Sequence, residues 1–369
     1  MRYTRVTTAV ALLAALAACT TAKDTPSFNP TPRPTRPGQV VIIAGAPDNY
    51  RPPRDGEYAV KAGAQSDGGL AVDPATGLVY FRALANDASV VVRIERDGRV
   101  STFRVKNRGG QLAVVSGQLW IMSSAKGLQL SKMALSTLQE TDVLTTENDR
   151  PIRILDEAGR PVSSSEQRKL DGQWTDSRFA MRGDGRPIIV SGAGDLFEVQ
   201  AANEVRIWRP SGFEEARRKA MGSGKQRPLA LVANGRSGAI VLAASGLVRI
   251  DTGGAASGTA FPGLPRGIPA WSAATPLADG SVLLLGGTTA FERKPRPALL
   301  RPDGRLVALS LGGPQWCGQF DGSMAIVASA EPGGLAVTPG GDHLVMDKNC
   351  GRIYSFRLPA DIGGVPRRG

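Results

Sequence analysis

Histidine is nearly absent from this chain, because His343 is the only one among its 369 residues. Zinc sites and general-base sites in secreted enzymes usually draw on several histidines, so a histidine-rich zinc site is excluded. A calcium site made of carboxylates needs no histidine and is not excluded. Serine catalysis would depend on His343 alone, and the sequence contains no Gly-x-Ser-x-Gly motif and no Cys–His pair.

Aromatic residues are also scarce, at 5% of the chain, and no interior segment shows a sustained helical period. Glycine and proline are frequent instead, with 45 and 26 residues, and they separate many short apolar runs. This combination is typical of an all-β protein rich in turns. The net charge is +12, but it is spread along the chain without a dense basic block, so no nucleic-acid partner is expected.

The longest apolar run lies at the N-terminus, where two arginines precede a stretch from about Val6 to Ala18. A bilayer span needs about 20 residues, so this shorter run predicts a secretory signal peptide over residues 1–18. The letters LAAC that end at Cys19 resemble the lipobox of bacterial lipoproteins. That resemblance implies cleavage before Cys19, a lipid on its thiol and a membrane-anchored, extracytoplasmic protein. The alternative is an ordinary signal peptide with a chance cysteine.

Residues 19–38 contain five prolines and nothing that could form a core. They predict an extended tether between the lipidated Cys19 and the folded part of the chain, with a reach of at most about 60 Å. The folded part begins with the apolar run Val40 to Gly45, which has no partner strand close to it in the sequence.

The rest of the chain repeats. The stretch 68–105 contains four short strands separated by turns, and the stretch 333–359 contains the first three of them without a fourth. Weaker copies occupy 109–145, 178–210, 228–262 and 271–311. Six units of four antiparallel strands, each unable to bury both of its faces alone, predict an all-β fold, a six-bladed β-propeller.

Two of these units resemble NHL repeats, through "GLAVDPATGLVYF" and "GLAVTPGGDHLVMDKNCGRIYSF". The resemblance covers about 39–105 and 333–359. Because the last unit lacks its outer strand, we expect Val40 to Gly45 to supply it, which closes the ring and covers its edge strands. The propeller then spans 39–359 and is followed by a short tail, 360–369.

Four long connections join the fourth strand of one unit to the first strand of the next, and they share one face of the propeller. They are 46–69, 146–176, 211–227 and 312–333. We expect loops of this length to form a binding surface, and the tether to enter on the other face. Within one of them, Arg217, Arg218 and Lys219 are candidate docking residues, and a solvated capping helix is the alternative.

The remaining cysteines, Cys317 and Cys350, predict a disulfide in an oxidising compartment, with two free thiols as the alternative. Polar residues also follow several predicted first strands, although Asp-Gly and Asn-Gly turns explain some of them. These candidate axial or binding residues are Asp73, Arg182, Asn234 and Asp279.

Together these features favour a lipid-anchored extracytoplasmic module that binds a protein, a cell-wall polymer or a glycan. No catalytic residue, metal ligand or cofactor is assigned. The alternative is an enzyme resembling the propeller lactonases or lyases, with calcium held by carboxylates at the axis.

Overall fold

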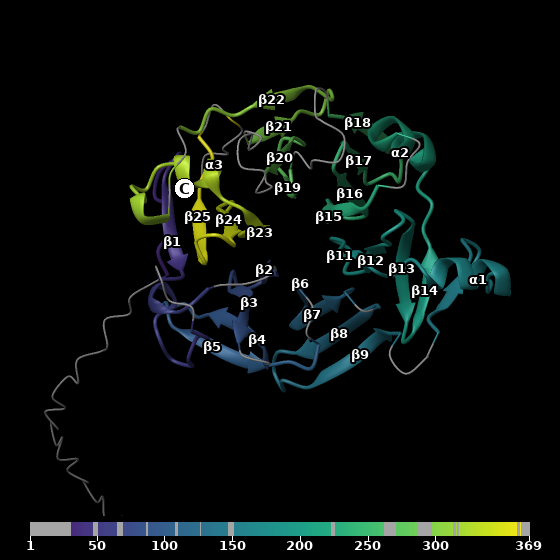
Figure 1. The fold of residues 1–369 in the computed structure, drawn as a ribbon, viewed down its shortest axis with the longest axis horizontal. Coiled ribbons are helices and arrows are strands. Elements are labelled where there is room, and N and C mark those ends of the chain that lie inside the picture. The colour runs from purple at the N-terminus through teal and green to yellow at the C-terminus, as the bar shows by residue number, and fades with distance from the viewer. Residues whose placement is uncertain are drawn as a thin grey trace, which may run out of the picture.

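Six β-sheets are arranged as blades around a central axis in the computed structural model of the protein (Figure 1). The model confirms the predicted six-bladed β-propeller, with four antiparallel strands forming each blade. The structure describes residues 31–46, 51–64, 69–85, 88–107, 110–125, 127–146, 151–222, 226–261, 271–286, 297–312, 315, 317–359 and 362. The predicted signal peptide and Cys19 lie outside these ranges.

The strands of each blade follow one another from the axis to the rim. Blade 1 contains β2 (Leu70–Val72), β3 (Val79–Ala85), β4 (Ala88–Ile94) and β5 (Val100–Arg104). Blade 2 contains β6 (Gln111–Val115), β7 (Gln118–Ser123), β8 (Gln129–Ala134) and β9 (Glu140–Thr145). Blade 3 contains β11 (Arg178–Met181), β12 (Pro187–Val190), β13 (Leu196–Ala201) and β14 (Glu204–Ile207).

The second half of the ring is built in the same way. Blade 4 contains β15 (Pro228–Asn234), β16 (Gly238–Ala243), β17 (Gly246–Ile250) and β18 (Ala256–Ala260). Blade 5 contains β19 (Ala273–Pro276), β20 (Val282–Leu285), β21 (Ala298–Leu300) and β22 (Leu306–Ala308). Blade 6 contains β23 (Pro332–Val337), β24 (His343–Asp347), β25 (Arg352–Phe356) and, as its outer strand, β1 (Val40–Ala44).

The N-terminal strand therefore closes the ring as the sequence predicted. β1 pairs antiparallel with β25, with Val40 opposite Phe356 and Ile42 opposite Tyr354. In Figure 1 the purple β1 lies beside the yellow β25, so the two ends of the folded chain share one sheet. This pairing gives β25 a hydrogen-bonded neighbour on its outer edge.

Residues 31–38, which the sequence assigns to the tether, lie against the propeller. Thr31 Oγ1 donates a hydrogen bond to the carbonyl of Glu95 at 3.0 Å, and the N–H of Gly38 donates to the carbonyl of Arg357 at 2.9 Å. Pro34 is buried. Residues 31–38 are therefore in contact with the ring.

The four long connections contain helices and strands that fill the wedges between blades. These elements are η1 (Ala59–Lys61), β10 (Arg153–Leu155), α1 (Ser164–Asp171), α2 (Phe213–Met221), η3 (Cys317–Gln319) and α3 (Ala325–Ser329). β10 adds a fifth, parallel strand to blade 3 beside β14, and α2 packs against β17 and β18. Because blades radiate from the axis, their outer strands diverge, and apolar side chains must fill the space between them.

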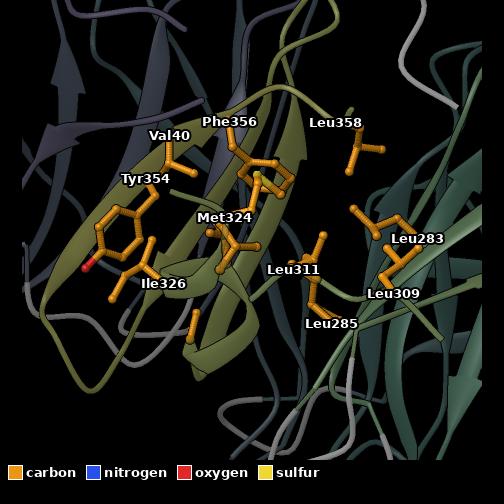
Figure 2. Packing of buried hydrophobic residues seen from close by; sticks show 14 of the residues in the cluster. Val40, Leu283, Leu285, Leu309, Leu311, Met324, Ile326, Tyr354, Phe356 and Leu358 are labelled. Atoms are coloured by element: carbon orange, nitrogen blue, oxygen red, sulfur yellow. The ribbon is translucent and has the colours of Figure 1, made fainter. Parts of the chain in front are cut away.

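Figure 2 shows one such wedge, between blades 5 and 6. Met324 and Ile326, at and within α3, pack with Leu283 of blade 5 and with Tyr354 and Phe356 of blade 6. In the same way α2 buries Phe213, Ala216, Ala220 and Met221 between blades 3 and 4. We expected these connections to be loops that form a binding surface. That expectation is wrong for their apolar residues, because these residues are part of the core.

None of the helices in the described ranges combines the length and the apolar character that crossing a membrane requires.

Candidate functional site

The strand order defines two faces of the ring. The tether face carries the turns between first and second strands and between third and fourth strands, and residues 31–38 lie on it. The connector face carries the turns between second and third strands and the connections from each blade to the next. The first strands of neighbouring blades lie side by side around the axis, so both faces have a central mouth.

The four predicted axial residues all lie on the tether face, each at or just after the end of a first strand. Asp73 and Asp279 hold their own turns, whereas Asn234 bonds to the third strand of its blade. The Asp73 carboxylate accepts hydrogen bonds from the N–H of Ala75 at 3.0 Å and from Thr76 Oγ1 at 2.6 Å. Asn234 Nδ2 donates to the carbonyl of Ile250 at 2.9 Å. Asp279 accepts from the N–H and hydroxyl of Ser281 and pairs with Arg301 at 3.2 Å.

Arg182 belongs to a buried ion network in blade 3. Its side chain is 6% exposed and donates to Glu198 at 2.6 Å and to Asp184 at 2.6 Å, while Arg206 donates to the other Glu198 oxygen at 2.5 Å. The Arg182 guanidinium also lies 5.2 Å from the ring centre of Trp208. Within the described residues, no hydrogen bond or ion pair joins one of the four predicted axial residues to another.

The predicted docking residues Arg217, Arg218 and Lys219 lie on α2. A capping helix at this position is the alternative that the sequence analysis names. Arg217 pairs with Glu214 at 2.8 Å, whereas Arg218 and Lys219 are exposed on the side away from the wedge. The acidic first turn and basic last turn match the helix dipole, and Gly222 ends the helix at a φ of 74°.

The predicted disulfide joins Cys317 and Cys350, whose Cα atoms lie 5.3 Å apart. It connects η3 to the hairpin between β24 and β25. Arg352 Nη1 donates to the carbonyl of Cys317 at 2.5 Å, so the connection is held to blade 6 twice. The disulfide and this hydrogen bond together hold the connector against blade 6, the blade that closes the ring.

His343 lies at the start of β24, and its side chain is buried. Its ring stacks on Phe356 with centroids 5.3 Å apart, and neither ring nitrogen has a hydrogen-bond partner among the described residues. Burial lowers the pKa of His343 to about 4, although the neighbouring Asp342 opposes this shift. A neutral, buried imidazole at this position is part of the blade's packing.

A polar cluster that the sequence analysis missed lies at the mouth on the connector face. The starts of three neighbouring first strands meet there, and the cluster consists of Gln111, Ser124, Asp176, Arg178 and Arg227. Arg178 Nε donates to the carbonyl of Leu229 at 2.9 Å. Gln111 and Ser124 both donate to the carbonyl of Ser177, each at 3.1 Å. These bonds join blades 2, 3 and 4 beside the axis.

The charged members of this mouth cluster are two arginines and one carboxylate. Asp176 pairs with Arg227, while Arg178 Nη1 bonds only to backbone carbonyls in the described ranges. Burial lowers the pKa of Arg178; the charge of Asp176 opposes this shift and the charge of Arg227 adds to it. Asp176 also has a φ of 63°, a left-handed conformation that is costly for a residue other than glycine.

The mouth cluster thus contains two guanidinium groups, one carboxylate, one amide and one hydroxyl. Arginine binds carboxylate and phosphate through paired N–H donors, and the cluster carries an excess of one positive charge. Sequence reasoning missed this cluster because its residues come from positions up to 116 apart, from Gln111 to Arg227. The candidates were taken from the ends of first strands, whereas the charged residues of the cluster lie at or just before the starts of first strands.

No group of three or more His, Cys, Asp or Glu side chains in the described part of the chain is arranged to hold a metal ion.

No family model matches the chain, and no curated protein matches its sequence. Solved structures share its fold. A structural genomics protein of unknown function from Bacteroides thetaiotaomicron has a TM-score of 0.55 at 14% identity, over 86% of this chain and 75% of that one. An auxiliary nutrient binding protein from Bacteroides ovatus has a TM-score of 0.50 at 11% identity, over 86% and 76%.

Virginiamycin B lyase from Staphylococcus aureus is a third similar structure, with a TM-score of 0.47 at 11% identity, over 78% of this chain and 93% of that one. At these identities the likeness shows the β-propeller fold alone. The lyase likeness, below a TM-score of 0.5, carries no argument about activity.

Proposed function

We propose that this protein is a lipid-anchored extracytoplasmic binding module, whose ligand contacts the mouth cluster on the connector face. The observation that supports this most is that the mouth cluster holds two guanidinium groups but a single carboxylate, which pairs with Arg227, while Arg178 Nη1 bonds only to backbone carbonyls in the described ranges. An anionic group on a ligand would restore the charge balance there. The left-handed backbone at Asp176 is the kind of local strain that often accompanies a binding site.

The ligand class follows from the same side chains. Guanidinium groups suit carboxylates and phosphates, and the Gln111 amide and Ser124 hydroxyl suit sugar hydroxyls. An anionic cell-wall polymer or glycan, or an acidic segment of a protein, fits this set. Proteins of similar fold include one described as nutrient-binding and one described as a lyase, so the choice of class rests on the site and not on the fold.

Lipid attachment at Cys19 and the envelope location are part of this proposal, and the lipobox resemblance supports them. Mass spectrometry of the protein from its native membrane would detect the acyl chains on the N-terminal cysteine. An unmodified Cys19, or cleavage at another residue, would contradict the anchor without bearing on the mouth cluster.

Binding at the mouth cluster is tested by calorimetric titration with soluble peptidoglycan fragments and with a phosphate-rich wall polymer. We expect at least one probe to bind, and Arg227→Gln to weaken its affinity by about fivefold or more, because a charge-assisted hydrogen bond is lost. Arg209→Gln is the matched control, since Arg209 lies on the same face, forms an ion pair and is 62% exposed against 63% for Arg227.

The control should change the affinity by less than about twofold. Equal losses in Arg227→Gln and Arg209→Gln would place binding elsewhere on the connector face. Failure of every probe to bind would contradict an anionic cell-wall polymer or glycan as the ligand.

A further inference from the structure

We propose that a pocket on the tether face, between blades 6 and 1, binds a small amphipathic anion, with an apolar chain and one anionic group. The mouth cluster lies on the other face, so this inference does not depend on the proposed function. Its evidence is the pocket's size, its apolar floor and two exposed arginines in its lining.

The N-terminal segment forms one wall of this pocket. Thr31 Oγ1 donates a hydrogen bond to the carbonyl of Glu95, in the outer turn of blade 1, at 3.0 Å. Further along the chain, the N–H of Gly38 donates to the carbonyl of Arg357, just after the last strand of blade 6, at 2.9 Å. The segment therefore crosses from one blade to the other, and the residues that it contributes to the lining are Thr31, Pro32, Arg33 and Thr35.

Apolar side chains form the floor of the pocket. Val79 and Ile94 come from blade 1, while Ile43 and Leu344 come from blade 6. All four belong to the apolar cluster that fills the wedge between these two blades. The pocket has a volume of about 640 Å³. Small-molecule sites usually have volumes of about 300–1,000 Å³ and mostly apolar linings, so an apolar chain fits this one.

The pocket continues toward the outer turn of blade 1. A second hollow of about 690 Å³ extends as far as Asp97. The two hollows share the lining residues Thr76, Leu78, Glu95 and Arg96. Together they form an elongated site along blade 1, a shape that suits a chain better than a compact ring system.

The charges in the lining favour an anion. Three carboxylates belong to the two hollows, and each has an arginine partner outside them: Glu95 with Arg93 at 2.5 Å, Asp342 with Arg357 at 2.5 Å and Asp97 with Arg99 at 3.9 Å. The arginines of the lining itself are Arg33 and Arg96. Both are exposed, and neither forms an ion pair with any residue that the structure describes. Two positive charges therefore lie unmatched beside an apolar floor.

These features define the chemistry of the ligand. A guanidinium binds a carboxylate or phosphate oxygen through paired N–H donors. The attraction is stronger beside an apolar wall, because less water screens the charges there. Burial of an apolar chain against the floor adds stabilisation in proportion to the area removed from water. An aliphatic carboxylate combines both features, so decanoate is the probe that fits this site.

The test is calorimetric titration of the full chain, carrying Cys19→Ser so that no acyl chain of its own competes for the pocket. We expect decanoate to bind, and decanol and decylammonium to bind at least about fivefold more weakly, because neither offers an anion to the arginines. The double variant Arg33→Gln, Arg96→Gln should weaken decanoate binding by about fivefold or more, because charge-assisted hydrogen bonds are lost.

The matched control is the double variant Arg36→Gln, Arg236→Gln. Both residues are exposed on the tether face and form no ion pair within the described ranges, and neither lines the pocket. Because it removes the same charge from the same face, the control separates a site in the pocket from a general effect of positive charge. It should change the affinity for decanoate by less than about twofold.

A photoreactive diazirine analogue of decanoate locates the site. Its crosslinks should fall within the segments that surround the pocket, which are 31–36, 76–79, 94–96 and 338–344. Crosslinks concentrated elsewhere, at the mouth cluster for example, would overturn the proposal. Equal losses in the two double variants, equal binding of decanol and decanoate, or no binding of decanoate would overturn it as well.

Discussion

Most polar side chains that the fold buries serve the protein's own backbone or ion pairs. Asp73 holds a turn, and Arg182 and Glu198 neutralise each other inside blade 3. A buried ion pair of this kind is costly to break, because removing one partner leaves an uncompensated charge. His343 is buried as well, but neither of its ring nitrogens has a hydrogen-bond partner in the described ranges.

His343 predicts a loss of stability as the pH falls. Its pKa is about 4 in the folded protein against a usual value of 6.5, so between these values the unfolded chain binds the proton and the folded protein does not. The free energy of unfolding should therefore fall by about 2 kcal/mol from about pH 6.5 to pH 5. Urea unfolding at both pH values measures this change.

The control for this prediction is His343→Leu, which replaces the imidazole with an apolar side chain in the same packing. Asp342 and its partner Arg357 remain and contribute equally in both proteins. The variant should lose most of the pH dependence in this window. An unchanged pH dependence would show that His343 is not the group responsible.

Elements in the wedges depend on close approach between backbones. A Cβ atom added at Gly258 of β18 would lie 1.9 Å from the carbonyl oxygen of Ala216 in α2. We therefore expect Gly258→Ala to push α2 out of its wedge and to lower the free energy of unfolding by about 1–3 kcal/mol, the range for overpacking. Thermal unfolding monitored by circular dichroism would measure the loss.

Gly110→Ala is the matched control, because nothing described lies within 4 Å of its added Cβ and its φ is not positive. Its effect should stay within about 0.5 kcal/mol. A harmless Gly258→Ala would mean that α2 does not pack on β18 as described.

The strands and the helix at 213–221 could be predicted from the sequence, whereas the burial of the wedge elements could not. Short apolar runs recur in every blade, Asp-Gly or Asn-Gly turns occur in four of the six, and both are local signals. The burial of Phe213 or Met324 instead depends on how far neighbouring blades diverge, which no local pattern records. The mouth cluster was missed for a similar reason, since Gln111, Arg178 and Arg227 meet only after three blades are assembled.

The whole molecule has two unlike faces because its chain closes on itself. β1 joins blade 6, so residues 31–38 must lie on the face opposite the blade-to-blade connections. The proposed ligand site at the mouth cluster therefore lies on the face opposite residues 31–38. If β1 lay elsewhere, this placement of the N-terminal segment would lose its basis.

Hydrogen exchange of the backbone amides tests this closure most directly. We expect the amides of Val40–Ala44 to be protected to a similar degree as those of Arg352–Phe356, because the two strands share one ladder. Exchange of Val40–Ala44 at the rate of a free peptide, with Arg352–Phe356 still protected, would contradict it.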